Sequence, residues 1–295
     1  MTVVEFNYDP RYDVFNILFQ KDVHNKGGML GVKPFDSMPA GLKPVLSIKD
    51  ADDKQQASIK FVVDWIQKTY KPEDLKASAE AVGRKWKGVE ARYFAALAQV
   101  TKHQMKPPKV TAYMSHGFPL LRDSQNFSFI VFDKLSSPEK NCAIIAHELF
   151  LLHIYSSPIW GKISSQLQKN HCYLLAECLS VVLNGGAFAQ AGIPKWTPYP
   201  ALREIQDLFA KKYAETKDFA RLVDFAIEVF KQNFKKAQGG VSGGVQIPLQ
   251  KKTIDRQGEY SLLSSFAFLD SKVWGIPIWI YFVAFLLVII LLSGR

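Results

Sequence analysis

His147 and Glu148 begin a sequence pattern that can hold a metal ion. They lie in the stretch NCAIIAHELFLLHIYSSP, residues 141–158, and match the first half of the His-Glu-x-x-His pattern of zinc hydrolases. The position four residues after His147 holds Leu151, however, and the next histidine is His153. Whether these residues form a working site therefore depends on where the chain places His153.

The spacing of the two histidines determines whether they can share an ion. Residues at i and i+4 of a helix lie about 40° apart around the axis, so both imidazoles can reach one metal. His153 follows His147 by six positions, which at about 100° per residue places it about 120° away. We expect a shared ion only if the helix unwinds or bulges after Leu151. Glu148 would then be the general base that takes a proton from metal-bound water.

Glu177 is a further candidate ligand, because a carboxylate in an apolar helix needs a partner. It lies in CYLLAECLSVVLN, residues 172–184, among leucines and valines, where an unpaired charge is costly. The predicted zinc ligands are His147, Glu177 and His153, with His171 as the alternative to His153. Their side chains must lie within about 4 Å of a common point, because zinc binds nitrogen and oxygen at about 2 Å.

Helices dominate the elements that would position these residues. Helical patterns are predicted over residues 53–70, 71–102, 138–155, 167–184, 200–213 and 218–236. Two strands, 110–115 and 126–132, are separated by turn residues and predict a small hairpin or sheet. The first 57 residues are predicted to be irregular and to pack on the core, apart from a short helix over 12–20. The predicted fold class is α+β, mostly α.

The C-terminal segment Val273–Leu292 predicts a transmembrane helix. Its twenty residues carry no charge, and a helix of about that length spans a hydrocarbon core of about 30 Å. Trp274, Trp279 and Tyr281 lie at its entry side, where interfacial aromatic residues are enriched. A buried central helix of a globular core is the alternative interpretation.

A basic linker is predicted between this helix and a main domain over residues 58–236. The linker, 237–272, is rich in Gly, Gln and Lys and lacks periodicity. Between Lys231 and Arg256 there are six basic residues and one acidic residue, so the positive-inside rule places the domain in the cytoplasm. The basic residues could also rest on anionic lipid, or form a solvated loop.

Composition excludes several other classes of protein. The 295 residues carry 37 Lys and Arg against 27 Asp and Glu, a net charge of +10, yet no nucleic-acid-binding motif accompanies this charge. Cys142, Cys172 and Cys178 are an odd number in apolar helices, which argues against a disulfide framework. Glu5 and Asp9 interrupt the N-terminal pattern that a secretory signal requires. His24, His103 and His116 are expected at the surface.

The motifs together resemble a group of uncharacterised bacterial proteins with a zincin-like core. The resemblance covers residues 126–230 and rests on NFSFIVF, AHELFLLH, LLAECLSVVLN and PYPALREI. It implies that His147 and Glu177 match metal ligands and that Glu148 matches the catalytic base. It also implies that the strand at 126–132 is the edge strand along which a peptide substrate pairs. Leu151 replaces the family's second histidine.

Three functions remain open from the sequence. The first is a membrane-tethered, cytoplasm-facing zinc peptidase with an altered motif. The second is the same fold without metal, serving as a tail-anchored binding or scaffolding protein. The third is a lipid-surface module that uses the basic linker. The expected partners are the lipid bilayer and a peptide or protein, and no nucleic acid is expected.

Overall fold

The computed structural model divides into two compact units, Met1–Gln250 and Lys251–Arg295. It describes residues 2–28, 33–36, 38–50, 55–69, 71–116, 122–123, 126–132, 138–197, 199–238, 272–273 and 276–277. In the second unit, β5 (Lys272–Val273) pairs antiparallel with β6 (Ile276–Pro277). Of the predicted linker, only residues 237, 238 and 272 are described. Of the predicted membrane helix, only residues 273, 276 and 277 are described, so Trp274, Trp279 and Tyr281 lie outside the described residues.

A four-stranded sheet of order β1-β2-β4-β3 forms the centre of the first unit. Its strands are β1 (Val3–Asn7), β2 (Lys109–Ser115), β3 (Arg122–Asp123) and β4 (Ser128–Phe132). β1, β2 and β4 are parallel, and β3 pairs antiparallel to β4. Of the predicted hairpin or small sheet, the sheet is confirmed; β2 and β4 do not form a hairpin, because they pair in parallel. The prediction that 126–132 is an edge strand is also wrong, since β4 has a partner on each side.

The described part of the first 57 residues confirms the short helix predicted over 12–20 and adds a strand and two 3-10 helices that were not predicted. β1 pairs with β2 across more than 100 residues, with Val3 opposite Lys109. The helix α1 (Pro10–Asn25) begins after Asp9, whose carboxylate accepts a hydrogen bond from the backbone N–H of Arg11. Two 3-10 helices, η1 (Pro34–Asp36) and η2 (Ala40–Ser47), follow. Outside that helix, the prediction of an irregular segment is wrong, because a strand of five residues is recognisable only beside its distant partner.

The helical stretch predicted over 71–102 is two helices, α3 (Pro72–Lys87) and α4 (Glu90–Thr101). The break coincides with a buried carboxylate at Glu90. Its Oε1 accepts hydrogen bonds from the backbone N–H of Val4 (2.8 Å) and from Trp86 Nε1 (3.1 Å). The side chain thereby satisfies a donor on the outer edge of β1, which has no further strand beside it among the described elements.

The remaining helices confirm the predicted order and add two short ones. They are α2 (Gln56–Thr69), α5 (Pro138–Ser156), α6 (Pro158–Ser164), α7 (Lys169–Leu179), η3 (Ser180–Asn184), α8 (Gly186–Gln190), η4 (Pro200–Leu202), α9 (Arg203–Thr216) and α10 (Phe219–Gln238). The helix expected over 138–155 is confirmed. The possibility that it unwinds after Leu151 is excluded, because α5 stays helical to Ser156.

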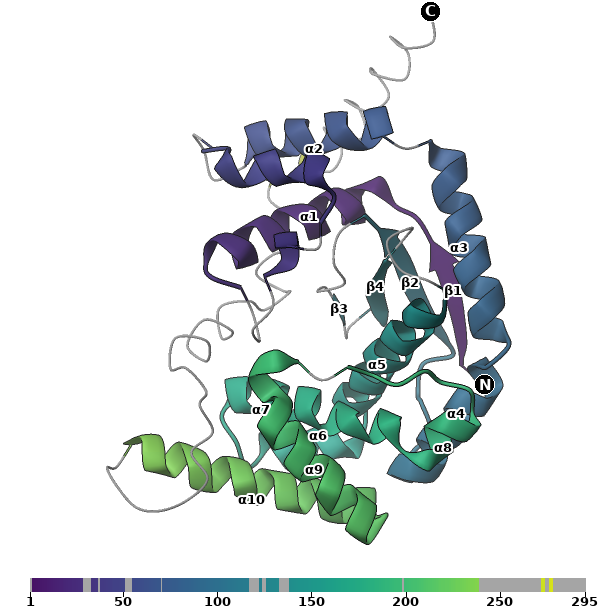
Figure 1. Cartoon of the computed structure of the whole chain (residues 1–295), viewed down its shortest axis with the longest axis vertical. Coiled ribbons are helices and arrows are strands. Elements are labelled where there is room, and N and C mark those ends of the chain that lie inside the picture. The colour runs from purple at the N-terminus through teal and green to yellow at the C-terminus, as the bar shows by residue number, and fades with distance from the viewer. Residues whose placement is uncertain are drawn as a thin grey trace, which may run out of the picture. The chain divides into compact units, whose positions relative to one another are not determined.

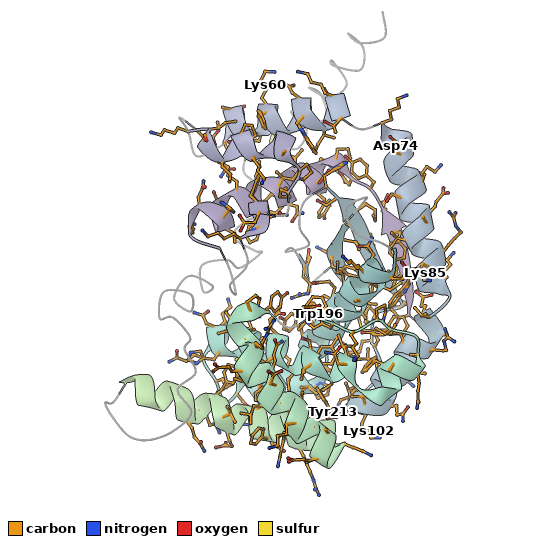
Figure 2. All side chains as sticks on the ribbon, in the orientation of Figure 1. Lys60, Asp74, Lys85, Lys102, Trp196 and Tyr213 are labelled. Atoms are coloured by element: carbon orange, nitrogen blue, oxygen red, sulfur yellow. The ribbon has the colours of Figure 1, made fainter. Side chains whose placement is uncertain are left out.

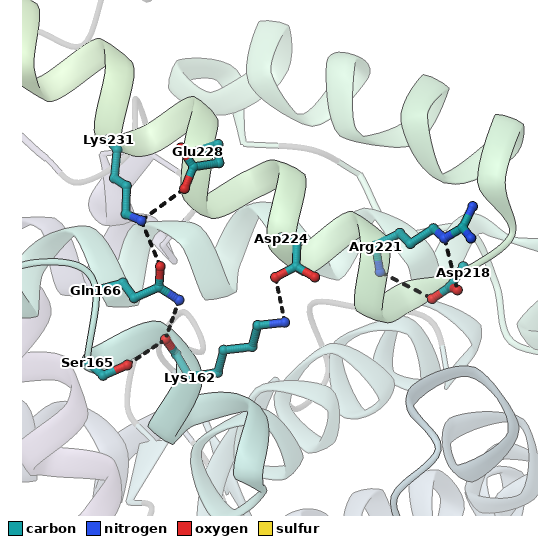
Figure 3. A network of polar contacts seen from close by, with 8 residues as sticks. All are labelled: Lys162, Ser165, Gln166, Asp218, Arg221, Asp224, Glu228 and Lys231. Carbon is teal, nitrogen blue, oxygen red and sulfur yellow. Dashed lines mark hydrogen bonds and ion pairs between the residues drawn. The ribbon is translucent and has the colours of Figure 1, made fainter.

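Helices cover the sheet on both sides, which confirms a mostly helical α+β fold. In Figure 1, α1 and α2 lie above the sheet and α5 below it, while α3 runs beside β1. Polar contacts join the helices farther from the sheet: Lys162 of α6 forms an ion pair with Asp224 of α10 at 2.5 Å (Figure 3). Lys231 of α10 donates a hydrogen bond to Gln166 at 2.7 Å.

No single helix within the described residues has both the length and the apolar composition of a membrane span. One bent pair, Glu139–Ser156 with Pro158–Ser164, meets these criteria jointly, with a bend of 72° between its halves.

A charge-paired candidate site between α5, α7 and β3

Two neighbouring helices bring together His147 and Glu177, two of the three predicted ligands. His147 lies in the interior of α5 and is fully buried, and Glu177 lies in α7. His147 Nε2 and Glu177 Oε2 are 3.1 Å apart. Neither atom makes a hydrogen bond of acceptable geometry with any described residue, and neither does His147 Nδ1. The two atoms face each other without forming a linear bond.

Arg122 of the edge strand β3 supplies the positive charge of this site. Its Nε donates a hydrogen bond to Glu148 Oε2 at 2.5 Å, and its Nη2 lies 3.6 Å from Glu177 Oε1. The guanidinium also lies over the ring of Tyr155, at 5.8 Å from the centroid. Arg122 therefore bridges both carboxylates, and its side chain is only 15% exposed.

The electrostatics of the site favour an ionised Glu177. Burial alone would raise the pKa of Glu177, but the contacts with His147 and Arg122 outweigh it and lower that pKa. Burial would likewise lower the pKa of Arg122, yet Glu148, Tyr155 and Glu177 raise it. Burial raises the pKa of Tyr199 well above its ordinary value, and the neighbouring carboxylates add to this effect. The site thus holds charges of both signs with little water.

Aromatic rings cover His147. The indole of Trp196, labelled in Figure 2, stacks on the imidazole with centroids 3.8 Å apart and planes 7° from parallel. Tyr199 meets the imidazole edge-on at 6.1 Å. Asn184 holds this segment: its Nδ2 donates to the carbonyl of Trp196 (3.0 Å) and its Oδ1 accepts from Trp196 N–H (2.7 Å). Asn184, the last residue of η3, therefore fixes the position of the Trp196 ring over His147.

His153 lies away from this site. Its Nε2 is 2.9 Å from Thr101 Oγ1 in α4, and burial together with nearby His103 lowers its pKa to about 4. Thr101 also donates a hydrogen bond to the carbonyl of Leu97, so we assign the Nε2 proton of His153 to the bond with Thr101. Leu151, where the second histidine would stand, is fully buried.

Within the described part of the chain, no third ligand joins His147 and Glu177. Among the described residues, no group of three His, Cys, Asp or Glu side chains lies close enough to hold one metal ion. His171, the alternative ligand, is a buried residue in the first turn of α7. The donor set therefore fits a catalytic zinc only in part, because such sites use three protein ligands.

A second buried polar group was not predicted. His116, expected at the surface, is fully buried at the end of β2, and its Nδ1 contacts Asp13 Oδ2 in the first turn of α1. The other oxygen of Asp13 accepts hydrogen bonds from Ser115 Oγ (2.6 Å) and His116 N–H (3.0 Å). The surface expectation for His116 is wrong because it assumed a hairpin loop, whereas the residue ends a central parallel strand.

Arg122 was also missed by the sequence analysis, which assigned it to a turn. The available signal was indirect: two carboxylates in apolar helices without a complete ligand set require a cation from elsewhere in the chain. Comparisons of this chain with protein-family models, with curated proteins and with solved structures found no match.

Proposed function

We propose that this protein is a membrane-tethered binding protein with a zincin-like core in which an arginine replaces the catalytic metal. The observation that carries the proposal is the position of Arg122, paired with Glu148 at 2.5 Å and 3.6 Å from Glu177. These are the two carboxylates that the resemblance assigns to the base and to a metal ligand.

The charge of Arg122 disfavours a metal ion in the same place. Two unit charges 4 Å apart interact by about 4 kcal/mol at an effective dielectric constant of about 20. A divalent cation beside the guanidinium would meet this repulsion for each of its charges. The negative charges of Glu148 and Glu177 would offset it, but Arg122 already pairs with both carboxylates. The guanidinium already neutralises one buried carboxylate charge, so the cluster does not need a metal for stability.

Glu148 is also poorly placed to act as a base. Its Oε2 accepts the short hydrogen bond from Arg122, whereas a general base needs a free oxygen directed at the proton it removes. Hydrolysis would require Arg122 to leave first. Binding requires no such step, and β3, the strand that carries Arg122, lies at an edge of the sheet. A partner peptide that added to this edge would lie beside the charge-paired site.

One observation favours the zinc hydrolase as a second candidate. The 3.1 Å between His147 Nε2 and Glu177 Oε2 is close to the separation of two ligands on one tetrahedral zinc ion, and neither atom is hydrogen-bonded to the described residues. In that case zinc would supply activated water. His147 and Glu177 would hold the zinc ion. Glu148, once released from Arg122, would accept the proton of the water.

The membrane tether rests on residues 273–292 alone. Their charge-free run and the aromatic residues Trp274, Trp279 and Tyr281 support a C-terminal anchor, with the main domain in the cytoplasm. The binding site would then operate close to a bilayer.

The test of the proposal is peptide hydrolysis by the full chain, supplied with zinc, compared with Glu148→Gln. Fluorogenic peptides and unfolded casein serve as substrates. We expect no hydrolysis above that of Glu148→Gln, because Arg122 holds the carboxylate. Zinc-dependent cleavage that Glu148→Gln abolishes would establish the second candidate instead.

A further inference from the structure

A short segment of the chain, residues 194–197, lies across His147 as a strap. Its exposed side chains are Lys195 and Thr197. Between them, the indole of Trp196, labelled in Figure 2, stacks on the imidazole of His147 with ring centroids 3.8 Å apart. His147 itself is fully buried. The strap therefore forms part of the wall between this side chain and solvent.

The side chain of Asn184 holds the backbone of the strap. Its Nδ2 donates a hydrogen bond to the carbonyl of Trp196 at 3.0 Å, and its Oδ1 accepts one from the N–H of Trp196 at 2.7 Å. Among the described residues, no other hydrogen bond reaches the backbone of residues 194–197. Asn184 is exposed, so both bonds compete with water and stabilise the closed strap only modestly.

The chain is fixed on either side of the strap. Before it, Gly192 has a φ of +83°, a left-handed conformation that favours glycine. Ile193 then donates its backbone N–H to the carbonyl of Phe188 at 3.0 Å. After the strap, the carbonyl of Tyr199 accepts a hydrogen bond from the N–H of Leu202 at 3.0 Å. A segment with few backbone hydrogen bonds between two anchored ends can open locally while the rest of the fold stays intact.

The closed strap leaves one donor unsatisfied. The indole Nε1 of Trp196 is buried and has no hydrogen-bond acceptor among the described residues. An indole N–H is only a donor, and its burial without an acceptor forfeits the hydrogen bond that water would provide. Opening returns this N–H to water and so offsets part of the stacking lost with His147. The closed and open arrangements are therefore closer in free energy than the stacking alone implies.

We infer that residues 194–197 open and close over the candidate site, and that the two hydrogen bonds from Asn184 set how often they open. This inference rests on the proposed binding function, because it describes how a partner gains access to His147. Strap opening of this kind controls entry to many binding sites. Removal of the Asn184 side chain should raise the open population while leaving the residues of the site unchanged.

The test is hydroxyl-radical footprinting of the full chain in detergent, with the oxidation of each histidine measured by mass spectrometry. We expect Asn184→Ala to raise the oxidation rate of His147 about tenfold, because two hydrogen bonds that close the strap are lost. Asn184→Asp keeps an acceptor for the N–H of Trp196 but loses the donor, so its rate should be intermediate. His153 is the internal control, because it is fully buried in the same helix but contacts α4. Asn25→Ala, which removes an exposed asparagine of α1, should change neither rate.

A second comparison tests whether Asn184 acts through the ring of Trp196. Trp196→Ala removes the cover, so the oxidation of His147 should rise, and adding Asn184→Ala should change it little further. An unchanged His147 rate in Asn184→Ala, an equal rise at His147 and His153, or full additivity of the two substitutions would overturn the inference. Failure of the proposed function has a different result, namely zinc-dependent peptide hydrolysis that Glu148→Gln abolishes.

Discussion

At the scale of single residues, Arg122 decides the chemistry of the site. Its guanidinium lies against Glu148 and Glu177 in a nearly water-free environment. Removing one partner of a buried ion pair leaves an uncompensated charge, which typically costs 3–5 kcal/mol. Arg122 is therefore both the cation of the site and a structural link between β3 and the helices α5 and α7.

Replacing Arg122 with leucine should lower the free energy of unfolding by about 3–5 kcal/mol, because two buried carboxylates lose their counter-ion. Chemical denaturation of the full chain measures the change. Arg221→Leu in α10 is the control, since its ion pair with Asp218, the residue before that helix, is exposed (Figure 3). It should change stability by no more than about 0.5 kcal/mol. Equal effects of the two substitutions would remove the case for Arg122 as the counter-ion.

His153 should make stability depend on pH. Its pKa is lowered to about 4 in the folded protein, against about 6.5 unfolded. The unfolded chain therefore binds more protons between these values, and stability is lost as pH falls from 6.5 to 4, by up to about 3 kcal/mol. Denaturation at several pH values should show a shallower loss in His153→Gln than in the parent. Thr101→Val, which keeps the imidazole, should retain the slope. An identical loss in His153→Gln would assign the pH dependence to other groups.

At the scale of elements, the continuity of α5 separates the two histidines. Because the helix stays regular to Ser156, position 151 lies on the same face as His147, and His153 turns toward Thr101 of α4. The six-residue spacing thus predicted that, in a regular helix, His147 and His153 would not reach the same ion. It could not show whether the helix was regular, since that depends on packing around its last two turns.

Restoring the motif should therefore create a metal site. In Leu151→His with Arg122→Ala, histidines at i and i+4 and Glu177 would supply three ligands without the competing charge. We expect about one zinc per chain in this double variant by elemental analysis of folded protein. Arg122→Ala alone, with two ligands, is the control and should hold less. No zinc in the folded double variant would contradict the zincin-like arrangement of α5 and α7.

The elements predicted from sequence were those with local patterns. Helices such as α5 and α10 carry their periodicity and boundaries within one stretch, so they were found. β1 and β3 were missed because five and two residues acquire meaning only beside β2 and β4. The same limit hid Arg122 and the Asp13–His116 contact, which join residues 26 to 103 positions apart. Long-range pairing of this kind leaves little local signal.

At the scale of the whole molecule, a charged site in a helical domain is combined with a tail predicted to enter a membrane. The net charge of +10 would favour contact with anionic lipid, but a hydrophobic span provides a far stronger attachment. Anchoring by the tail and lipid binding by the basic linker therefore predict different effects of substitutions on membrane attachment.

Substituting Phe285→Lys and Leu286→Lys should move the protein from the membrane to the soluble fraction, because charges near the centre of a span oppose insertion. Fractionation of cells after an alkaline carbonate wash measures this. Lys251→Gln with Lys252→Gln, which reduces the basic charge of the linker, should leave the protein in the membrane fraction. Release by the linker variant and retention of the tail variant would favour the lipid-surface interpretation.

The most direct measurement is the zinc content per chain of folded full-length protein that has been offered the metal, beside His147→Ala treated in the same way. We predict well under one zinc per chain in the parent and no difference between the two proteins, because Arg122 supplies the charge and Leu151 removes a ligand. One zinc in the parent, lost in His147→Ala, would contradict a metal-free site and make this protein a candidate hydrolase.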